Sequence, residues 1–303
     1  MKLPYRPPLM LSFSALPKNS NNTSAWHSGG EGADELLCGY AVQQWSGEDY
    51  DRRLKIDSGE WTPGPKATRL FQQSLMRQYG RDHFQSEVDH YFALNSLIPT
   101  AVKPALFNPD VWQSAAEDQP MLDYYRDQFA TRESEPTSVK LKRILHKTNL
   151  EALLSRLDSA TMQASLEARV PYTDHRIVEK MFRAPMNFKI DVDDSEQAPY
   201  LASGDLQQRD SLRSKRVLRS VAEQLMPVEL AQRKKASFPT PVQQWMGNEW
   251  SDWAARTLSE SPFAHAVFQP AALAELTENP GQSGMWLWPI LNIACWGDRA
   301  FAA

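Results

Sequence analysis

The sequence predicts a mainly α-helical protein with few strands. Apolar residues recur at helical spacing over most of the chain after about residue 63, and strand-like alternation is confined to residues 11–15 and 186–192. The hydrophobic fraction of 42% and the charged fraction of 23% are typical of a folded globular protein. A length of 303 residues is enough for one large domain or two smaller ones.

The first part of the chain predicts an irregular segment followed by several helices. Residues 1–27 form the irregular segment, with a possible strand at 11–15 and a polar loop at 17–24. Helical stripes then follow at three places. They are residues 70–79, residues 88–92 after the break at Gly80, and residues 123–129. The apolar residues of the first two stripes are Leu70, Phe71, Leu75 and Tyr79, then Val88, Tyr91 and Phe92.

The second part predicts a helix that begins at Asn149, whose side chain suits an N-cap. Residues 131–138 and 191–210 are expected to be exposed loops, and residues 186–192 an isolated extended segment. A further helical stripe at 217–225 is closed by Pro227. The many tryptophans after residue 244 are expected in a core or an interface. The leucines of the Asn149 helix are Leu150, Leu153, Leu154 and Leu157.

Composition excludes several classes of function and location. The net charge is −4 and the pI is near 5.9, which gives no general attraction to nucleic acid or to an anionic membrane. No apolar run approaches the roughly 18 residues of a bilayer span, and three prolines interrupt the N-terminal stretch that a secretory signal would need. Two cysteines cannot build a disulfide framework, and the six histidines lack metal-ligand spacing. We therefore expect a cytoplasmic protein.

The most informative segment is the glycine-rich turn at residues 28–35, Ser-Gly-Gly-Glu-Gly-Ala-Asp-Glu. Backbone N–H groups in such a turn form a concavity that binds anions, so Gly30 and Gly32 are predicted to hold phosphate. The carboxylates Glu31, Asp34 and Glu35 beside them suit Mg²⁺. The turn therefore predicts a magnesium pyrophosphate site, and the alternative is a turn that only caps a helix.

Two other segments carry charge next to prolines. Glu167 and Arg169 lie just before Pro171, where they form either a structural ion pair or part of a pocket for an acidic substrate. Lys235 closes a run of three cations before a Pro-containing turn, and such a run either holds phosphate or a developing oxyanion or is a solvated surface cluster. Cys38, at a predicted helix start, is placed for a lowered thiol pKa, but no histidine partner marks it as a nucleophile.

Together these segments resemble the synthetase domain of the asparagine synthetase family. Residues 30–40 resemble the family's S-G-E-G-A-D-E-L-F-G-G-Y loop, and residues 147–174 resemble its K-T-N-L to E-A-R-V-P-F-L-D stretch. Residues 215–219 resemble K-x-x-L-R, residues 235–245 resemble K-x-x-F-P-T-P-x-x-x-W, and residues 292–296 resemble the closing helix. Order and spacing agree from about residue 28 to the C-terminus.

The resemblance implies an ATP-dependent, amide-forming ligase of an amidotransferase family used in biosynthesis. A carboxylate substrate would be adenylated, magnesium pyrophosphate would leave, and an amine would then form the amide. By the same resemblance, Asp34 is the Mg²⁺ ligand, Glu31 is the base for the amine, and Lys235 stabilises charge on the phosphates and the tetrahedral intermediate. The implied fold is the helical C-terminal portion of an α/β, PP-loop (adenine-nucleotide α-hydrolase-like) synthetase domain over residues 28–303.

Three departures from the family pattern shape the prediction. Position 2 is Lys instead of the catalytic Cys of glutamine-hydrolysing members, the upstream S-G-G-x-D-S pyrophosphate loop is absent, and residues 21–27 are polar. We therefore expect a partner chain that supplies the first half of the domain, and an exposed apolar face that favours this partner or a homo-oligomer. The alternatives are a catalytically degenerate subunit that acts as a binding or scaffolding partner, and a ligase that uses a pre-activated substrate.

Overall fold

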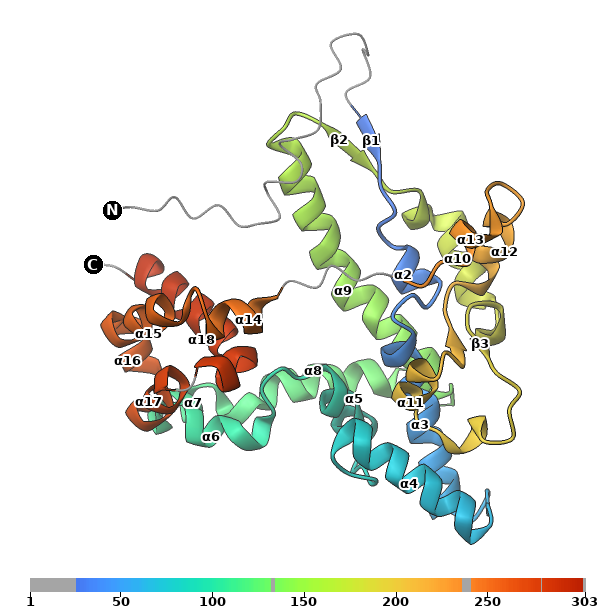
Figure 1. Cartoon of the computed structure of the whole chain (residues 1–303), viewed down its shortest axis with the longest axis horizontal. Coiled ribbons are helices and arrows are strands. Elements are labelled where there is room, and N and C mark those ends of the chain that lie inside the picture. Colours follow the sequence, from blue (N-terminus) through green and yellow to red (C-terminus); the bar gives the residue numbers. More distant parts are fainter. Residues whose placement is uncertain (1–25, 132–133, 236–240, 279, 302–303) are drawn as a thin grey trace. The chain divides into compact units, whose positions relative to one another are not determined.

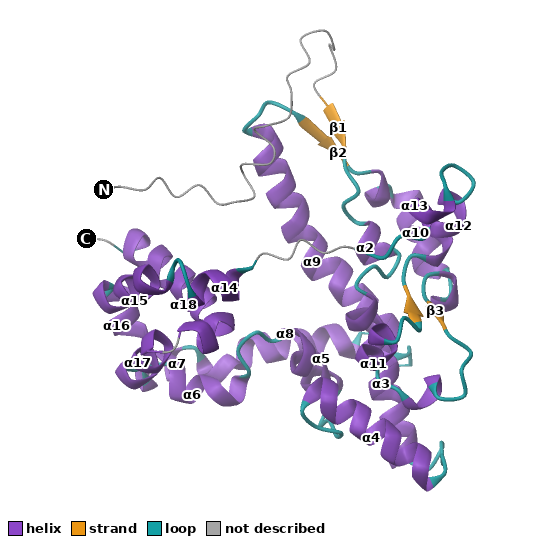
Figure 2. Cartoon of the chain, viewed as in Figure 1, coloured by secondary structure: helices purple, strands orange, loops and turns teal. Residues whose placement is uncertain are grey.

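The computed structural model describes residues 26–131, 134–235, 241–278 and 280–301 (Figure 1). Helices dominate this part of the chain, and its strands form two small sheets of two strands each (Figure 2). The predicted mainly α fold with few strands is confirmed. The strand expected at residues 11–15 lies outside the described residues. No described helix combines the length and apolar character that a bilayer span requires.

The chain divides into two compact units. The first unit contains residues up to Glu87 together with residues 132–233. Its α-helices are α2 (Ala33–Leu36), α3 (Ala41–Asp57), α4 (Pro65–Tyr79), α9 (Thr137–Met162), α10 (His175–Arg183), α11 (Ser203–Gln208), α12 (Arg216–Ala222) and α13 (Val228–Ala231). Three 3₁₀ turns complete it, η3 (Pro171–Thr173), η4 (Met186–Phe188) and η5 (Ala198–Tyr200).

Both sheets of the first unit join segments that are distant in the sequence. Strand β1 (Trp26–Ser28) pairs in parallel with β2 (Glu167–Arg169), with Ser28 opposite Arg169. Strand β3 (Asp191–Val192) pairs antiparallel with β4 (Leu212–Arg213). The first pairing matters most for the site, because it places the glycine turn that follows β1 beside the chain that continues from β2.

Close packing of α3 on the start of α9 depends on Gly47. A Cβ atom at this position would lie 2.2 Å from the backbone nitrogen of Ser138 and 2.5 Å from its Cα. Backbone atoms cannot move aside as a flexible side chain can, so the two helices would have to separate. Thr137, the first residue of α9, in turn donates its N–H and hydroxyl to the Asp51 carboxylate on α3 at 2.9 and 2.6 Å.

We expect Gly47→Ala to lower the free energy of unfolding by about 1–3 kcal/mol, the usual cost of overpacking. The measurement is urea denaturation followed by circular dichroism. Gly64→Ala is the matched control, because a Cβ atom there would have nothing within 4 Å and the φ of this residue is −60°. A change within about 1 kcal/mol is expected there. Equal effects of the two substitutions would contradict the close approach of α3 and α9.

A buried carboxylate ties three segments of the first unit together. Asp49 on α3 has no exposed surface, and its oxygens accept hydrogen bonds from the Tyr79 hydroxyl at 2.7 Å and from the Ser203 N–H and hydroxyl at 3.0 and 2.7 Å. Arg52 adds an ion pair at 2.6 Å. Burial raises the pKa of Asp49, while the arginine and these hydrogen bonds lower it. The network fixes α4 and the start of α11 against α3.

Helix α4 follows its predicted stripe, and the helical predictions at α5 (Glu87–Asn95) and at residues 123–129 are also confirmed. Phe71, Leu75 and Tyr79 are buried on one face of α4, which ends at Gly80 with a left-handed φ of 69°. The predicted start of the next long helix is wrong. Helix α9 begins at Thr137, so Asn149 lies inside it and caps nothing. Its first turns bury polar side chains through specific bonds, such as Lys140 with Glu87 at 3.1 Å, and apolar periodicity does not reveal them.

Two predictions after α9 are wrong as well. Residues 186–192 were expected to be extended, but 186–188 form η4 and only 191–192 lie in a strand. Short-range turn bonds decide this, since the Lys189 N–H donates to the Met186 carbonyl at 2.8 Å. The loop expected at 191–210 contains β3, η5 and α11, of which α11 is held by the Asp49 network. The stripe predicted at 217–225 forms α12 only as far as Ala222.

The second unit contains residues 88–131 and 234–303. Its core is formed by side chains such as Leu258, Phe268 and Leu287, with Trp250 and Trp288 packed against it, as expected for the tryptophan-rich region. Trp296, by contrast, is 59% exposed. The helices are α6 (Lys103–Leu106), α7 (Pro109–Ser114), α8 (Gln119–Ala130), α14 (Val242–Gly247), α15 (Ser251–Glu260), α16 (Pro262–Val267), α17 (Pro270–Glu278) and α18 (Pro280–Ala300), with 3₁₀ turns η1 (Thr100–Val102) and η2 (Ala116–Asp118).

Candidate functional site

The glycine turn links β1 to the short helix α2. The Gly29 N–H donates to the Arg169 carbonyl at 2.8 Å, and the Ala33 N–H donates to the Gly30 carbonyl at 3.2 Å. Gly32, the residue before α2, has a φ of 87°, a conformation that few residues other than glycine adopt. Apart from Gly30 and its two chain neighbours, no atom lies within 4 Å of the Cβ position of Gly30, which is exposed, so the backbone there is open to a ligand.

Asp34, on the first turn of α2, forms an ion pair with Lys215. Its Oδ1 lies 2.9 Å from the lysine Nζ, and the two side chains are 26% and 22% exposed. Gly39 makes room for the pair, since a Cβ atom there would lie 1.7 Å from Asp34 Oδ1 and 2.6 Å from Lys215 Cε. A carboxylate and an ammonium group therefore lie together beside the glycine turn.

Lys215 is the site residue to which sequence reasoning assigned no role. It lies just before α12 with a left-handed φ of 59°, and its N–H donates to the Leu37 carbonyl at 3.2 Å. The K-x-x-L-R resemblance marked the segment, but the contact with Asp34 depends on this backbone conformation. No local sequence pattern predicts a left-handed lysine.

Glu31 folds back over the turn. Its Oε2 would lie 2.3 Å from a Cβ at Gly29, and this oxygen is buried without a hydrogen-bond partner among the described residues. A buried carboxylate oxygen without a donor is unfavourable, so it favours a ligand that brings a cation or an N–H group. Nearby, burial and a hydrogen bond to Glu35 raise the pKa of Tyr40, so its hydroxyl stays protonated.

Glu167 and Arg169 form the predicted ion pair on β2, with Arg169 Nε 3.2 Å from Glu167 Oε1. Both side chains are exposed, and the guanidinium lies 5.9 Å from the centre of the Trp26 ring on β1. The pair lies on the strand whose carbonyl holds the glycine turn. This position suits a structural role and also leaves the guanidinium open to an acidic ligand.

The backbone leading to Lys235 is held by Arg219 of α12. The guanidinium Nη1 donates to the carbonyls of Ala231 and Arg233 at 3.1 and 2.9 Å, and Nε donates to the Ser214 carbonyl at 2.9 Å. Lys235 follows two residues later, and the segment after it, residues 236–240, for which a proline-containing turn was predicted, lies outside the described residues. The first unit therefore fixes the chain up to Arg233.

Cys38, which follows α2 in a left-handed conformation with φ of 58°, is fully buried. Burial raises the pKa of its thiol to about 11, so the lowered pKa expected from the sequence is wrong. Two buried lysines, Lys142 and Lys189, lie near it. Burial and the neighbouring Lys189 lower the pKa of Lys142 to about 7, and burial also lowers that of Lys189.

These lysines predict a pH dependence of stability. Between pH 7 and 9 the unfolded chain keeps a proton on Lys142 that the folded chain loses. The free energy of unfolding therefore rises with pH, by about 2 kcal/mol over this interval. Above pH 9 the Cys38 thiol acts in the opposite direction, because it ionises in the unfolded chain first. Lys142→Met should remove much of the rise, whereas Lys55→Met, at an exposed position, should not. A wild-type stability that is flat or falls from pH 7 to 9 would contradict this.

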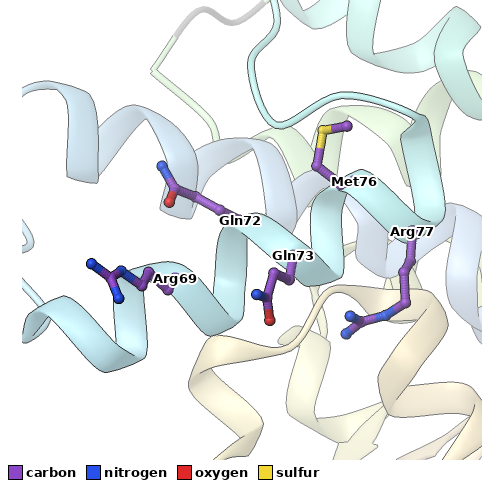
Figure 3. A pocket seen from close by; sticks show the side chains of 5 residues that line it. All are labelled: Arg69, Gln72, Gln73, Met76 and Arg77. Carbon is purple, nitrogen blue, oxygen red and sulfur yellow. The ribbon is translucent and has the colours of Figure 1, made fainter.

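A hollow of about 390 Å³ lies on the exposed side of α4 (Figure 3). It contains none of the site residues predicted from the sequence, and its Arg77 is already paired with Asp205. The lining side chains all project from this one helix, which suits a surface groove better than a reaction site. They are Arg69, Gln72, Gln73, Met76 and Arg77.

The fold and the site define a mainly helical protein with a glycine turn beside a paired carboxylate and ammonium group. The sequence profile described as asparagine synthase matches residues 23–298, and the chain belongs to this family. It is 25% identical to glutamine-hydrolyzing asparagine synthetase 1 of Bacillus subtilis over 88% of this chain and 39% of that protein. It is 29% identical to asparagine synthetase 3 of the same organism over 45% of this chain and 19% of that protein.

The chain thus spans about two fifths of the length of the first of these relatives. No solved structure matches it.

Proposed function

We propose that this chain carries part of the synthetase site of an ATP-dependent, amide-forming ligase. In this reaction a small carboxylate is adenylated, pyrophosphate leaves, and an amine attacks the acyl-adenylate. The main support is the pairing of Asp34 with Lys215 directly beside the open backbone of Gly30, in a chain of the asparagine synthase family. A carboxylate for a metal ion and a cation for phosphate are the groups that release of pyrophosphate requires.

The donor set fits Mg²⁺ when phosphate oxygens complete its coordination. Mg²⁺ sites commonly use one or two carboxylates together with substrate phosphates and water. Asp34 would be the principal protein ligand, with the backbone of Gly30 and Gly32 holding the phosphate. When bound, the ion would neutralise charge on the leaving pyrophosphate. Lys215, released from Asp34 by the ion, would remain free to hold a phosphate oxygen.

The remaining roles follow the family resemblance. Glu31 acts as the base for the incoming amine, and the unpartnered state of its Oε2 supports this role. Lys235 stabilises negative charge on the phosphates and the tetrahedral intermediate. Arg169, paired with Glu167, offers a guanidinium to the carboxylate substrate. These roles are predictions from the sequence. A cytoplasmic location is a prediction of the same kind.

We further propose that the S-G-G-x-D-S pyrophosphate loop, absent from this sequence, is contributed by a polypeptide outside it. Exposed apolar side chains at 221–230 support an association, as does the β1–β2 pair, which lacks a further strand within the described residues. These side chains are Val221, Leu225, Met226, Val228 and Leu230. Light scattering should detect a homo-oligomer or a complex, and a strict monomer that binds no polypeptide would count against this part.

The function is tested by following the two half-reactions separately. Pyrophosphate exchange into ATP should require a carboxylate substrate and Mg²⁺, with the chain assayed alone and with co-purifying polypeptides. Glu31→Gln should lower amide formation by about 10²–10⁴-fold, the usual contribution of a general base, and leave exchange nearly unchanged. Glu151→Gln, at an exposed position on α9, is the control. No exchange under any of these conditions would contradict the proposal.

A catalytically degenerate binding subunit is the second candidate. One observation favours it, namely that Lys215 already neutralises the Asp34 carboxylate. Calorimetry separates the two candidates. Binding of Mg-ATP that is lost in Asp34→Ala supports the ligase, whereas absence of nucleotide binding together with tight association with a polypeptide supports the subunit.

A further inference from the structure

Two lysine amines are buried near Cys38, and no carboxylate among the described residues pairs with them. Lys142 on α9 is 1% exposed and Lys189, just after η4, has no exposed surface. The two side chains are neighbours, and Lys189 contributes to the lowered pKa of Lys142. Otherwise Lys142 Nζ has only long contacts to the Met181 and Phe182 carbonyls, at 3.4 and 3.5 Å, and Lys189 donates to the Ala184 carbonyl. Neither forms an ion pair with a described acidic side chain.

A buried imidazole nitrogen without a hydrogen-bond partner among the described residues lies near Lys142. His146 follows Lys142 by one turn of α9, and its Nε2 is buried with no hydrogen-bond partner among the described residues. Both side chains pack on Phe182, whose ring centre lies 4.6 Å from Lys142 Nζ and 5.0 Å from the imidazole centre. The Cys38 thiol is a further titratable neighbour of both amines.

This cluster has an excess of donors over acceptors. Arg143, the remaining cation near Lys142, is already paired with Glu135 at 2.5 Å. Buried amines without counter-ions are unfavourable when charged, so they lose protons or acquire an anionic partner. What the cluster lacks is a small group with acceptor oxygens and a negative charge.

We propose that Lys142 is a carbamylation site, at which the amine captures carbon dioxide and the resulting carbamate pairs with Lys189. The geometry selects a small, uncharged reactant, because a buried cluster admits such a molecule through local opening more readily than a hydrated anion. The carbamate supplies two acceptor oxygens, one for the Lys189 ammonium and one for His146 Nε2. Both deficits of the cluster are then met by a single modification.

The reaction is balanced without any other reactant. The lone pair of the neutral Lys142 Nζ attacks the carbon of carbon dioxide and forms an N–C bond. One C–O π pair moves onto oxygen as the carbamate charge, and Nζ gives one proton to the solvent. Lys142 is the reacting amine because its pKa near 7 leaves it largely unprotonated under mildly alkaline conditions, and the Phe182 ring, 4.6 Å from Nζ, holds it in place.

Chemical trapping of the full-length protein tests the proposal. The protein is equilibrated with isotopically labelled carbon dioxide at mildly alkaline pH and then treated with a trialkyloxonium reagent, which converts carbamates to stable esters. Peptide mass spectrometry should locate the labelled ester on Lys142. In Lys142→Met this label should disappear without appearing on Lys189. In Lys189→Met it should fall by about tenfold or more, because a buried charge without its partner is unfavourable.

Lys55→Met is the control for exposed lysines and should leave the label on residue 142 unchanged. Methionine preserves the apolar stem of the buried lysines, and circular dichroism establishes that each variant is folded. Wild-type protein without label on Lys142, or label spread evenly over exposed lysines, would overturn the proposal. Labelled carbonate that binds but leaves no ester would also overturn it, since it would show a non-covalent anion.

Discussion

Asp34→Asn is expected to weaken binding of magnesium pyrophosphate by about 10–100-fold, the range found when metal sites lose a supporting group. The amide is nearly isosteric with the carboxylate but lacks the negative charge that attracts Mg²⁺. It also leaves Lys215 without its partner at 2.9 Å, so binding of free pyrophosphate should change much less. Titration calorimetry with pyrophosphate, with and without Mg²⁺, measures both effects.

The same substitution should barely change stability. The Asp34–Lys215 pair is partly exposed, and such pairs contribute about 0–1 kcal/mol to the free energy of unfolding. Asp57→Asn, which removes a surface partner of Arg53, is the control and should leave pyrophosphate binding unchanged. If Asp34→Asn bound magnesium pyrophosphate as tightly as the wild type, the assignment of Asp34 as the metal ligand would be wrong.

Asp49→Ala is expected to lower the free energy of unfolding by about 3–5 kcal/mol, the range for breaking a buried ion pair. The substitution removes the carboxylate that pairs with Arg52 and accepts hydrogen bonds from the Tyr79 hydroxyl and the Ser203 N–H. Chemical denaturation measures the loss. Asp49→Asn keeps the shape and part of the acceptor capacity, so it should lie between the wild type and the alanine variant.

Asp57→Ala provides a matched comparison on the same helix. Its pair with Arg53 is more exposed, and a change of at most about 1 kcal/mol is expected. If Asp49→Ala and Asp57→Ala proved equally destabilising, the Asp49 network would not hold α4 and α11 against α3.

Apolar periodicity predicted those elements that bury one apolar face. Phe71, Leu75 and Tyr79 define α4 both in the sequence and in the structure. The same signal failed at the start of α9, where Thr137, Ser138 and Lys140 are buried through hydrogen bonds and an ion pair. Polar burial depends on partners distant in the sequence, so a local pattern cannot reveal it.

The candidate site shows the same division. The glycine turn and the Glu167–Arg169 pair were visible because spacing along one segment carries them. The contact of Lys215 with Asp34 joins residues 181 positions apart and depends on a left-handed backbone. The high thiol pKa of Cys38 was equally hidden, because Cys38 is buried in a cluster with residues distant in the sequence, such as Ile190 and Leu206.

The short helix α12 connects two parts of the candidate site, so substitutions in it affect both parts. Lys215 at its start touches Asp34, and Arg219, one turn later, holds the carbonyls of Ala231 and Arg233. A tilt of this helix would move two things together. One is the contact of Lys215 with the Asp34 carboxylate, and the other is the start of the segment that leads to Lys235. Under the proposed function, a substitution in this helix would affect the group assigned to the metal ion and the segment that carries Lys235 at the same time.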